Sequence, residues 1–357
     1  MNNFGKNIRI SIFGESHGPI IGLTIDGLPA NFSFNLDKIN DILSLRRGQN
    51  DISTPRREKD EITFISGYFN NHTTGEPLTV IVKNENTNSN DYQEGVIRPG
   101  HADLTKYLKY TGSNDYRGGG ASSGRMTVVL CILGEICHQI LQTRQIEVVS
   151  HIYSLKNIND VKITQAHISS NIFKDLQQAS FPVVDERAKK AMLDLIKKTI
   201  KLNDSVGGVV ETFIFNAPAG LGEPFFNSFE SIISHLLFSI PGIKGVEFGD
   251  GFNLTKVYGS ASLDEISLEN KKITFATNHQ GGINGGISNG NYIVFRSAVK
   301  PPVSIKQEIK SINLKTNQNI ELTTLGRHDP TFVHRVLHVI NAITYYAILE
   351  MVMENEK

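Results

Sequence analysis

The sequence has no net charge and very little cysteine, and each absence excludes a class of function. Its 36 basic and 36 acidic side chains cancel, so no overall field attracts a nucleic acid or a membrane surface, and neither partner is expected. A site for anions must then be a local cluster of Arg and Lys. The only cysteines, Cys131 and Cys137, lie six residues apart in an apolar helical pattern. That spacing fits neither a zinc site nor a disulfide, so we interpret both as buried thiols and expect no metal site.

Long apolar runs are also missing. None approaches the length that a membrane span requires, and the N-terminus has no signal-peptide core, so a cytoplasmic protein is expected. No fixed-period repeat or low-complexity linker divides the 357 residues. We therefore expect a single domain over residues 1–357.

Hydrophobic periodicity predicts an α+β fold with helices layered on antiparallel sheets. Strands are expected at residues 7–13, 20–26, 62–68, 78–83, 146–153, 209–215, 243–248 and 292–299. Helices are expected at residues 36–47, from 104, and at 123–142, 186–201, 228–238 and 331–353. Asn35 and Asp103 are the expected N-caps of the first two helices. The stretch after Tyr153 has little signal and is expected to be a surface insertion. Residues 84–102 form a loop long enough to suggest a function.

The segment FGESHG, Phe13 to Gly18, fits the G-x-S-x-G pattern of a hydrolase nucleophile elbow. An elbow needs a helix directly after the serine, whereas the residues from Pro19 to Asp26 read as a strand. Ser16 and His17 are also adjacent, which is a poor arrangement for a base that activates a nucleophile. Two interpretations remain at this point: a hydrolase with Ser16 as nucleophile, or a glycine-bounded loop between two strands.

Two glycine-rich segments indicate close approach of a ligand to the backbone. YRGGGASSGRM, Tyr116 to Met126, places glycines and two serines where a helix begins, which suits an anion. It is nearly a P-loop, but Arg125-Met126 replaces the Lys-Ser/Thr pair and no strand precedes it. The alternative is a tight turn with Ser122 or Ser123 as N-cap. GGINGGISNG, Gly281 to Gly290, is either a ligand contact or a flexible loop, and it lacks the dinucleotide fingerprint.

Three further segments gather ionisable side chains. RPGHAD contributes Arg98 and His101, GRHDP contributes Arg327 and Asp329, and LRRGQNDISTPRR is rich in arginine. Each alone could be a solvated run of charges. Together, loops rich in Gly, His and Arg on a neutral chain predict one site for a small polyanionic ligand.

Taken in order, the segments FGESHG, RPGHAD, YRGGGASSGR, DSVGGVVE, GLGEP, GGINGGISNG and GRHDP resemble the chorismate synthase family along essentially the whole chain. The resemblance implies a β-α-β sandwich that assembles as a homotetramer. It implies the anti 1,4-elimination of phosphate from 5-enolpyruvylshikimate 3-phosphate, giving chorismate in the shikimate pathway. The family needs reduced FMN (FMNH2) without net redox change, and NADPH is implied only if the protein is bifunctional.

The resemblance also implies roles for individual residues. His17 acts as the acid at the leaving phosphate, His101 controls the protonation of the flavin, and Asp329 helps to move the proton taken from the substrate. The implied substrate-binding residues are Arg46, Arg47 and Arg125. The implied flavin-binding residues are Ser122, Ser123, Pro241, Gly242, Gly285, Lys300, Ser304 and Arg327.

The sequence departs from the family pattern at several positions. Ala121 stands where the family usually has arginine, Asp51 where a basic residue is expected, and Pro302-Val303 within the segment that follows Lys300. Lost arginines weaken an anion site, because each is a potential bidentate partner. Three hypotheses follow: an FMN-dependent lyase, a weakened or inactive relative that only binds flavin or anions, and the serine hydrolase.

Overall fold

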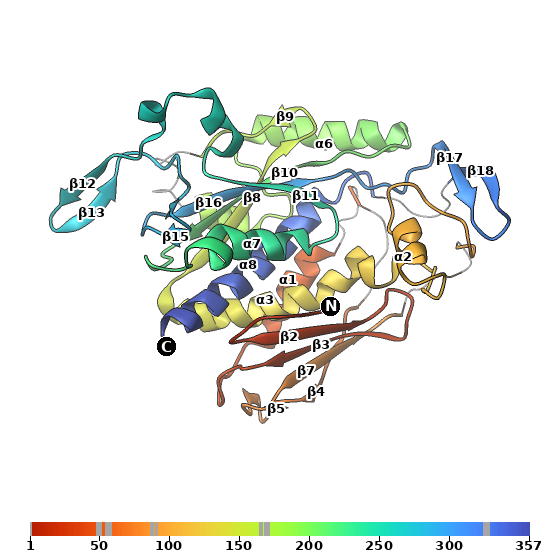
Figure 1. The fold of residues 1–357 in the computed structure, drawn as a ribbon, viewed down its shortest axis with the longest axis horizontal. Helices are drawn as coiled ribbons and strands as arrows, with labels where there is room; N and C mark the ends of the chain where they lie inside the picture. Colours follow the sequence, from red (N-terminus) through yellow and green to blue (C-terminus); the bar gives the residue numbers. More distant parts are fainter. Residues whose placement is uncertain are drawn as a thin grey trace.

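Two antiparallel sheets enclose a layer of helices, as Figure 1 shows. One sheet has the strand order β1-β2-β3-β7-β4 and the other β11-β16-β10-β8-β9. Helix α3 packs on β3 and β7 of the first sheet, whereas α8 packs on β8 and β10 of the second. Helices α1 and α7 complete the layer through contacts with α3 and α8. The expected α+β sandwich is confirmed.

The computed structural model describes residues 2–47, 52–53, 59–85, 89, 92–163, 167, 172–323 and 329–357. The strands of the first sheet are β1 (Asn3–Phe4), β2 (Arg9–Gly14), β3 (Ile20–Asp26), β4 (Ile62–Ser66) and β7 (Leu78–Lys83). Those of the second are β8 (Glu147–Leu155), β9 (Ile158–Asn159), β10 (Gly208–Phe215), β11 (Ile243–Phe248) and β16 (Ile293–Val299). The short hairpins are β5–β6 (Tyr68–Phe69, His72–Thr73), β12–β13 (Ile266–Glu269, Lys272–Phe275), β14–β15 (Ile283–Asn284, Ile287–Ser288) and β17–β18 (Glu308–Asn313, Gln318–Thr323).

The helices are α1 (Leu36–Arg46), α2 (Asp103–Lys109), α3 (Thr127–Leu141), α5 (Ile172–Gln178), α6 (Glu186–Lys201), α7 (Phe229–Phe238) and α8 (Val333–Asn355). Local sequence explains their ends and faces. The Asn35 side chain accepts a hydrogen bond from the Asp37 N–H at the start of α1, which confirms this N-cap. In β7 fully buried positions alternate with less buried ones, because one face lies on the helices.

Helix α3 begins later than the sequence indicates. Residues Gly120–Ser122 and Gly124–Met126 form two 3₁₀ turns, and the regular helix starts at Thr127. Ser123 is extended between the two turns and accepts a hydrogen bond from the Arg125 N–H. The serine therefore caps a 3₁₀ turn, and the glycine-rich segment reaches the helix in two steps.

Asp103 is not the N-cap of α2. It is the first helical residue, and its carboxylate accepts bonds from Arg98 Nε at 2.7 Å and Nη2 at 2.8 Å. A bidentate ion pair of this kind is stronger than a cap to a neutral N–H. The aspartate is therefore held by the loop before the helix.

The stretch after Tyr153 is more than a surface insertion. Asp160 accepts a bond from the Val184 N–H at 2.7 Å and pairs with His151 of β8 at 2.8 Å. His151 in turn contacts Glu211 of β10 at 2.9 Å. This buried charge network fixes the segment to the outer face of the second sheet, and Phe181 and Val183 add buried apolar contacts.

Among the described residues, two helical segments are long and apolar enough to span a membrane, Gly124–Arg144 and Val333–Asn355, whereas no such run was expected from the sequence. Inside the fold 78% and 89% of their apolar windows are buried, because the two helices pack against each other between the sheets. We therefore assign both to the core. Cys131 and Cys137 lie on the first of them, buried and without a disulfide, as expected.

Two buried histidines of α8 predict how stability depends on pH. Burial lowers the pKa of His338 to about 4, and burial together with Arg335 lowers that of His334 to about 3. In the unfolded chain a histidine binds a proton near pH 6.5. On acidification the unfolded state therefore takes up protons before the folded state does, and the stability of the fold decreases from about pH 6.5 downward. The loss for His338 is about 3 kcal/mol at most by pH 4.

Urea unfolding between pH 7 and pH 4 measures this effect. We expect His338→Leu to have a flatter pH profile than the wild type, whereas His235→Leu, at an exposed position, leaves the profile unchanged. An equal pH dependence of stability in all three proteins would show that carboxylates alone cause the loss of stability at acidic pH.

Candidate active site

One cleft gathers nearly all of the predicted site residues. It has a volume of about 630 Å³, within the usual range for a small-molecule site. The last turn of α1, the turns before α3 and the start of α8 form it, together with loops from both sheets. The predicted residues that line it are His17, Arg46, Arg47, His101, Ser122, Ser123, Arg125, Pro241, Gly242, Lys300, Ser304 and Asp329.

His17 lies in the loop between β2 and β3, and its side chain is held from several sides. Its Nδ1 is 3.2 Å from Ser89 Oγ, and its ring meets the Tyr92 ring edge-on at 5.1 Å. The residue is only 8% exposed. Both partners come from the long polar loop after β7, which supports the expectation that this loop is functional. A histidine held in one orientation at a cleft wall is suited to proton transfer.

Gly118 packs closely against the His17 imidazole. It has a φ of +60°, and a Cβ built on it would lie 2.5 Å from His17 Cδ2 and 2.8 Å from Nε2. We expect Gly118→Ala to displace the imidazole and to lower turnover by about 10²-fold, since small misplacements of reacting groups have effects of this size.

Steady-state assays of Gly118→Ala test this expectation against Gly259→Ala. A Cβ on Gly259 meets nothing within 4 Å, so this control is expected to retain wild-type turnover. Wild-type turnover in Gly118→Ala would show that the position of His17 is not critical.

His101 lies among the candidate flavin residues of the cleft lining. Its Nε2 is 2.9 Å from Ser304 Oγ, and the Lys300 ammonium donates to the Gly100 carbonyl at 2.8 Å. The Lys300 N–H donates to the Gly242 carbonyl at 2.9 Å, which places the Pro241-Gly242 turn beside the end of β16. Burial lowers the pKa of Lys300. The cluster combines a cation, an imidazole and a hydroxyl, and it fits an anionic ligand with a flat ring.

Asp329 stands shortly before α8 and pairs with Arg335, which was not predicted from the sequence. Arg335 Nη1 donates to Asp329 Oδ2 at 2.9 Å, and Arg335 Nε donates to the Arg46 carbonyl at 3.0 Å. Arg335 thus joins the candidate proton-transfer carboxylate to the end of α1. The pair lies six residues apart across the helix start, and neither periodicity nor a motif indicated it.

Arg46 is a buried cation at the base of the cleft. Its Nε donates to Thr127 Oγ1 at 3.0 Å and its Nη2 to the Gly124 carbonyl at 2.8 Å, but no carboxylate among the described residues pairs with it. Burial lowers its pKa to about 10, so the guanidinium remains charged at neutral pH. A buried charge without a counter-ion is costly. The site is therefore built to receive an anion.

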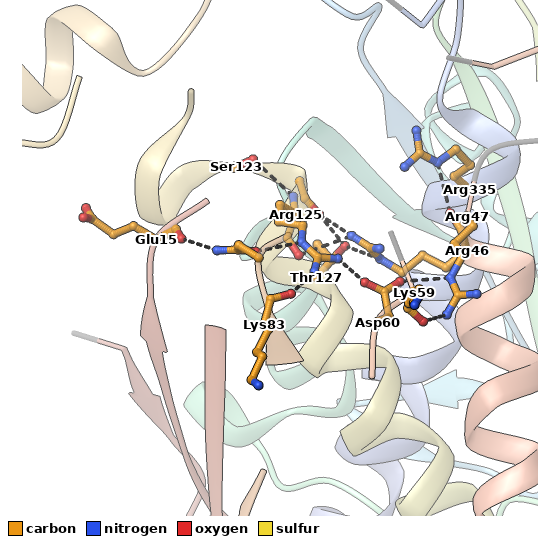
Figure 2. A network of polar contacts seen from close by, with 12 residues as sticks. Glu15, Arg46, Arg47, Lys59, Asp60, Lys83, Ser123, Arg125, Thr127 and Arg335 are labelled. Atoms are coloured by element: carbon orange, nitrogen blue, oxygen red, sulfur yellow. Dashed lines mark hydrogen bonds and ion pairs between the residues drawn. The ribbon is translucent and has the colours of Figure 1, made fainter. Parts of the chain in front are cut away.

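Arg47 and Arg125 also line the cleft, and both bind Asp60. Figure 2 shows the two guanidinium groups converging on this carboxylate. Arg125 also donates to Asn84 Oδ1 at 3.1 Å. Arg98, a further cation of the lining, binds Asp103 and lies 5.0 Å from the Tyr92 ring. Asp60 could have been suspected from its place beside the arginine-rich segment, whereas Tyr92 and Asn84 were indicated only as members of the long loop at residues 84–102.

Two positions singled out from the sequence, Gly285 and Ala121, do not line this cleft. Gly285 is in the β14–β15 hairpin, which Figure 1 shows at the end of the molecule opposite to α2. Within one chain it does not line the cleft. The carbonyl of the neighbouring Gly286 accepts a hydrogen bond from the Phe229 N–H at the start of α7. Arg327 lies outside the described residues, as does Asp51. Ala121 is exposed and does not contribute to the lining.

The arrangement brings a buried cation that contacts no carboxylate among the described residues together with two imidazoles and a carboxylate. It can bind a polyanion and transfer protons to and from it. The serine-hydrolase interpretation fails because β3 follows the loop directly, so Ser16 stands at no helix start.

Comparisons with known proteins place these features in a family. A family model described as chorismate synthase matches residues 8–353. A chorismate synthase of Dehalococcoides mccartyi is 40% identical over 355 residues, covering 99% of this chain and 96% of its own. One of Methanocaldococcus jannaschii is 39% identical over 374 residues, covering 99% and 97%. A crystal structure of chorismate synthase has a TM-score of 0.76 at 25% identity, covering 99% and 93% of the two chains.

Proposed function

The chain belongs to the chorismate synthase family, and from this premise we propose that its cleft uses reduced FMN to eliminate phosphate from 5-enolpyruvylshikimate 3-phosphate. The protein is a lyase of the shikimate pathway. The observation that carries the proposal is Arg46, a buried cation without a carboxylate partner among the described residues, at the base of a cleft that also holds His17, His101 and Asp329. Both ligands are anionic, and the cleft is cationic where the chain as a whole is neutral.

The residues of the cleft fit a flavin mononucleotide. Lys300, Ser304, Ser122, Ser123 and the Pro241-Gly242 turn would hold it, since they combine a cation, hydroxyls and closely packed backbone. Reduced flavin, when bound, supplies the partner for breaking an unactivated C–H bond, and the protein supplies orientation and proton management.

Proton management is divided among three side chains of the cleft, His17, His101 and Asp329. The elimination breaks a C–H bond and a C–O bond, and the leaving phosphate gains a proton. His17 acts as the acid at the phosphate oxygen, held by Ser89 and Tyr92. Asp329, fixed by Arg335, helps to move the proton taken from carbon, and His101 sets the protonation of the flavin. Arg46, Arg47 and Arg125 bind the carboxylates and phosphate of the substrate.

The same proposal covers assembly and location. The chain works as one domain, since a continuous hydrophobic core joins both sheets, and it acts in the cytoplasm as a homotetramer. Leu263, Ile266, Leu268 and Ile273 are at least 65% exposed on the β12–β13 arm, which supports an apolar interface. A flavin contact by Gly285 requires a second copy, because this residue does not reach the cleft of its own chain.

Anaerobic turnover tests the reaction. The protein is incubated with dithionite-reduced FMN and 5-enolpyruvylshikimate 3-phosphate, and phosphate and chorismate are measured. We expect equimolar products with reduced flavin and none with oxidised flavin. Tight flavin binding without turnover would instead support the inactive relative, for which the comparisons give no evidence.

A further inference from the structure

Asp60 is a buried carboxylate placed between two arginines of the cleft. It stands shortly before β4, and its residue exposure is 4%. Its Oδ2 accepts a hydrogen bond from Arg47 Nε at 3.1 Å, and its Oδ1 accepts one from Arg125 Nη1. Figure 2 shows the carboxylate between the end of α1 and the turns before α3. The charge thus joins two segments that are far apart in the sequence.

The backbone conformation at Asp60 offers a simpler explanation for an aspartate at this position. It must be separated from a role of the carboxylate charge in the cleft. Its φ is +54°, in the left-handed region where Asp and Asn are the most frequent residues after glycine. Aspartate could therefore be present only for the turn. A solvent-exposed side chain would fit that explanation, but the side chain of Asp60 is only 1% exposed and contacts two cations. A carboxylate is buried in this way only where its charge is used.

The contacts of Asp60 extend to the loop that carries His17. Arg125 donates to Asn84 Oδ1 at 3.1 Å. Asn84 Nδ2 then donates to the Glu15 carbonyl at 2.9 Å and to the Gly18 carbonyl at 2.8 Å, on either side of His17. A displacement of Arg125 would therefore change the position of the loop that carries His17.

The charges indicate what Asp60 does for a ligand. Arg47, Arg125 and Asp60 together carry one net positive charge, since two guanidinium groups share one carboxylate. The carboxylate offsets the mutual repulsion of the arginines and also repels a bound anion. It therefore adds little to ground-state affinity, and its benefit is a fixed direction for both guanidinium groups.

We propose that Asp60 is a positioning residue, an internal counter-ion that aligns Arg47 and Arg125 for the reaction and, through Asn84, steadies the His17 loop. The proposal rests on the proposed function of the cleft. It assigns to Asp60 an effect on kcat, and not on the affinity for anions.

Two substitutions separate the carboxylate from the turn. Asp60→Asn keeps the backbone preference and size, and Asp60→Gly accepts the positive φ without a side chain. We expect each to lower kcat about 10²-fold with KM changed less than about threefold, because misaligned groups mainly affect the transition state. Asp250→Asn is the matched control, since Asp250 also contacts two basic side chains, Lys162 and His279, but lies outside the cleft.

Calorimetry with inorganic pyrophosphate gives a readout that does not depend on turnover. We expect Asp60→Asn to bind this anion at least as tightly as the wild type at low salt, because a repelling charge has been removed. Wild-type kcat in both variants, a raised KM at unchanged kcat, or weaker pyrophosphate binding would each overturn the proposal. If the wild type itself shows no turnover, the proposed function fails, and the pyrophosphate affinities still test the role of Asp60.

Discussion

His17→Ala lowers kcat by about 10²–10⁴-fold while flavin binding stays near the wild-type value. This range is the usual contribution of a positioned general acid. The imidazole lies against Gly118 and contacts Ser89 and Tyr92. Lys300 and Ser304, the candidate flavin residues, contact a different segment, at Gly100 and His101. Loss of the ring is therefore expected to remove the proposed proton donor and to leave the candidate flavin residues in place.

Single-turnover kinetics and fluorescence titration with FMN measure the two effects separately. His17→Asn retains a polar atom that can bond Ser89 but cannot transfer a proton, and it is expected to be as slow as His17→Ala. His72→Ala, in the β5–β6 hairpin outside the cleft, is the control for loss of a histidine. Recovery of turnover in His17→Asn would show that the histidine only supports the loop.

Arg46→Met lowers kcat/KM by about 10²–10³-fold without destabilising the protein. The loss follows from removal of a desolvated cation that faces an anionic ligand, which typically costs about 2–5 kcal/mol of binding. Stability is retained because burial opposes the charge of Arg46 and no carboxylate among the described residues pairs with it. Methionine keeps most of the apolar stem and relieves the desolvation cost.

Substrate kinetics and thermal unfolding are measured on the same preparations. The melting temperature is expected to lie within about 4 °C of the wild type. Arg9→Met, at an exposed position at the start of β2, is the control for loss of an arginine. A large drop in melting temperature together with the activity loss would mean that Arg46 is a structural residue.

Much of the local structure follows from neighbouring residues. The strand after Gly18 is indicated by β-branched residues and a turn, and the N-cap at Asn35 by its place before a helical pattern. Both depend on interactions within a few residues, which a sequence displays directly. Asp103 was assigned wrongly because a cap and an ion pair use the same carboxylate, and only the position of Arg98 decides between them.

The candidate site was likewise predicted from the sequence only in part. The residue types in GESHG, RPGHAD and GGGASSGR predicted a polyanion site, and the cleft contains all three segments. Gly285 was predicted with them but lies elsewhere in the chain, whereas Asp60 and Arg335 were missed although they bind predicted residues. A motif identifies the chemistry of a segment, but it carries no information on which other segment will face it.

The sequence by itself determined the elements, the capping of α1 and the chemical character of the loops, because these depend on short-range preferences. Only the tertiary structure decided that α1, α3 and α8 bring Arg46, Thr127 and Arg335 into contact, and that Asp60 lies between two arginines. Contacts between residues so distant in the chain depend on how two sheets close over one helical layer. That closure is set by the packing of the whole core and by no single segment.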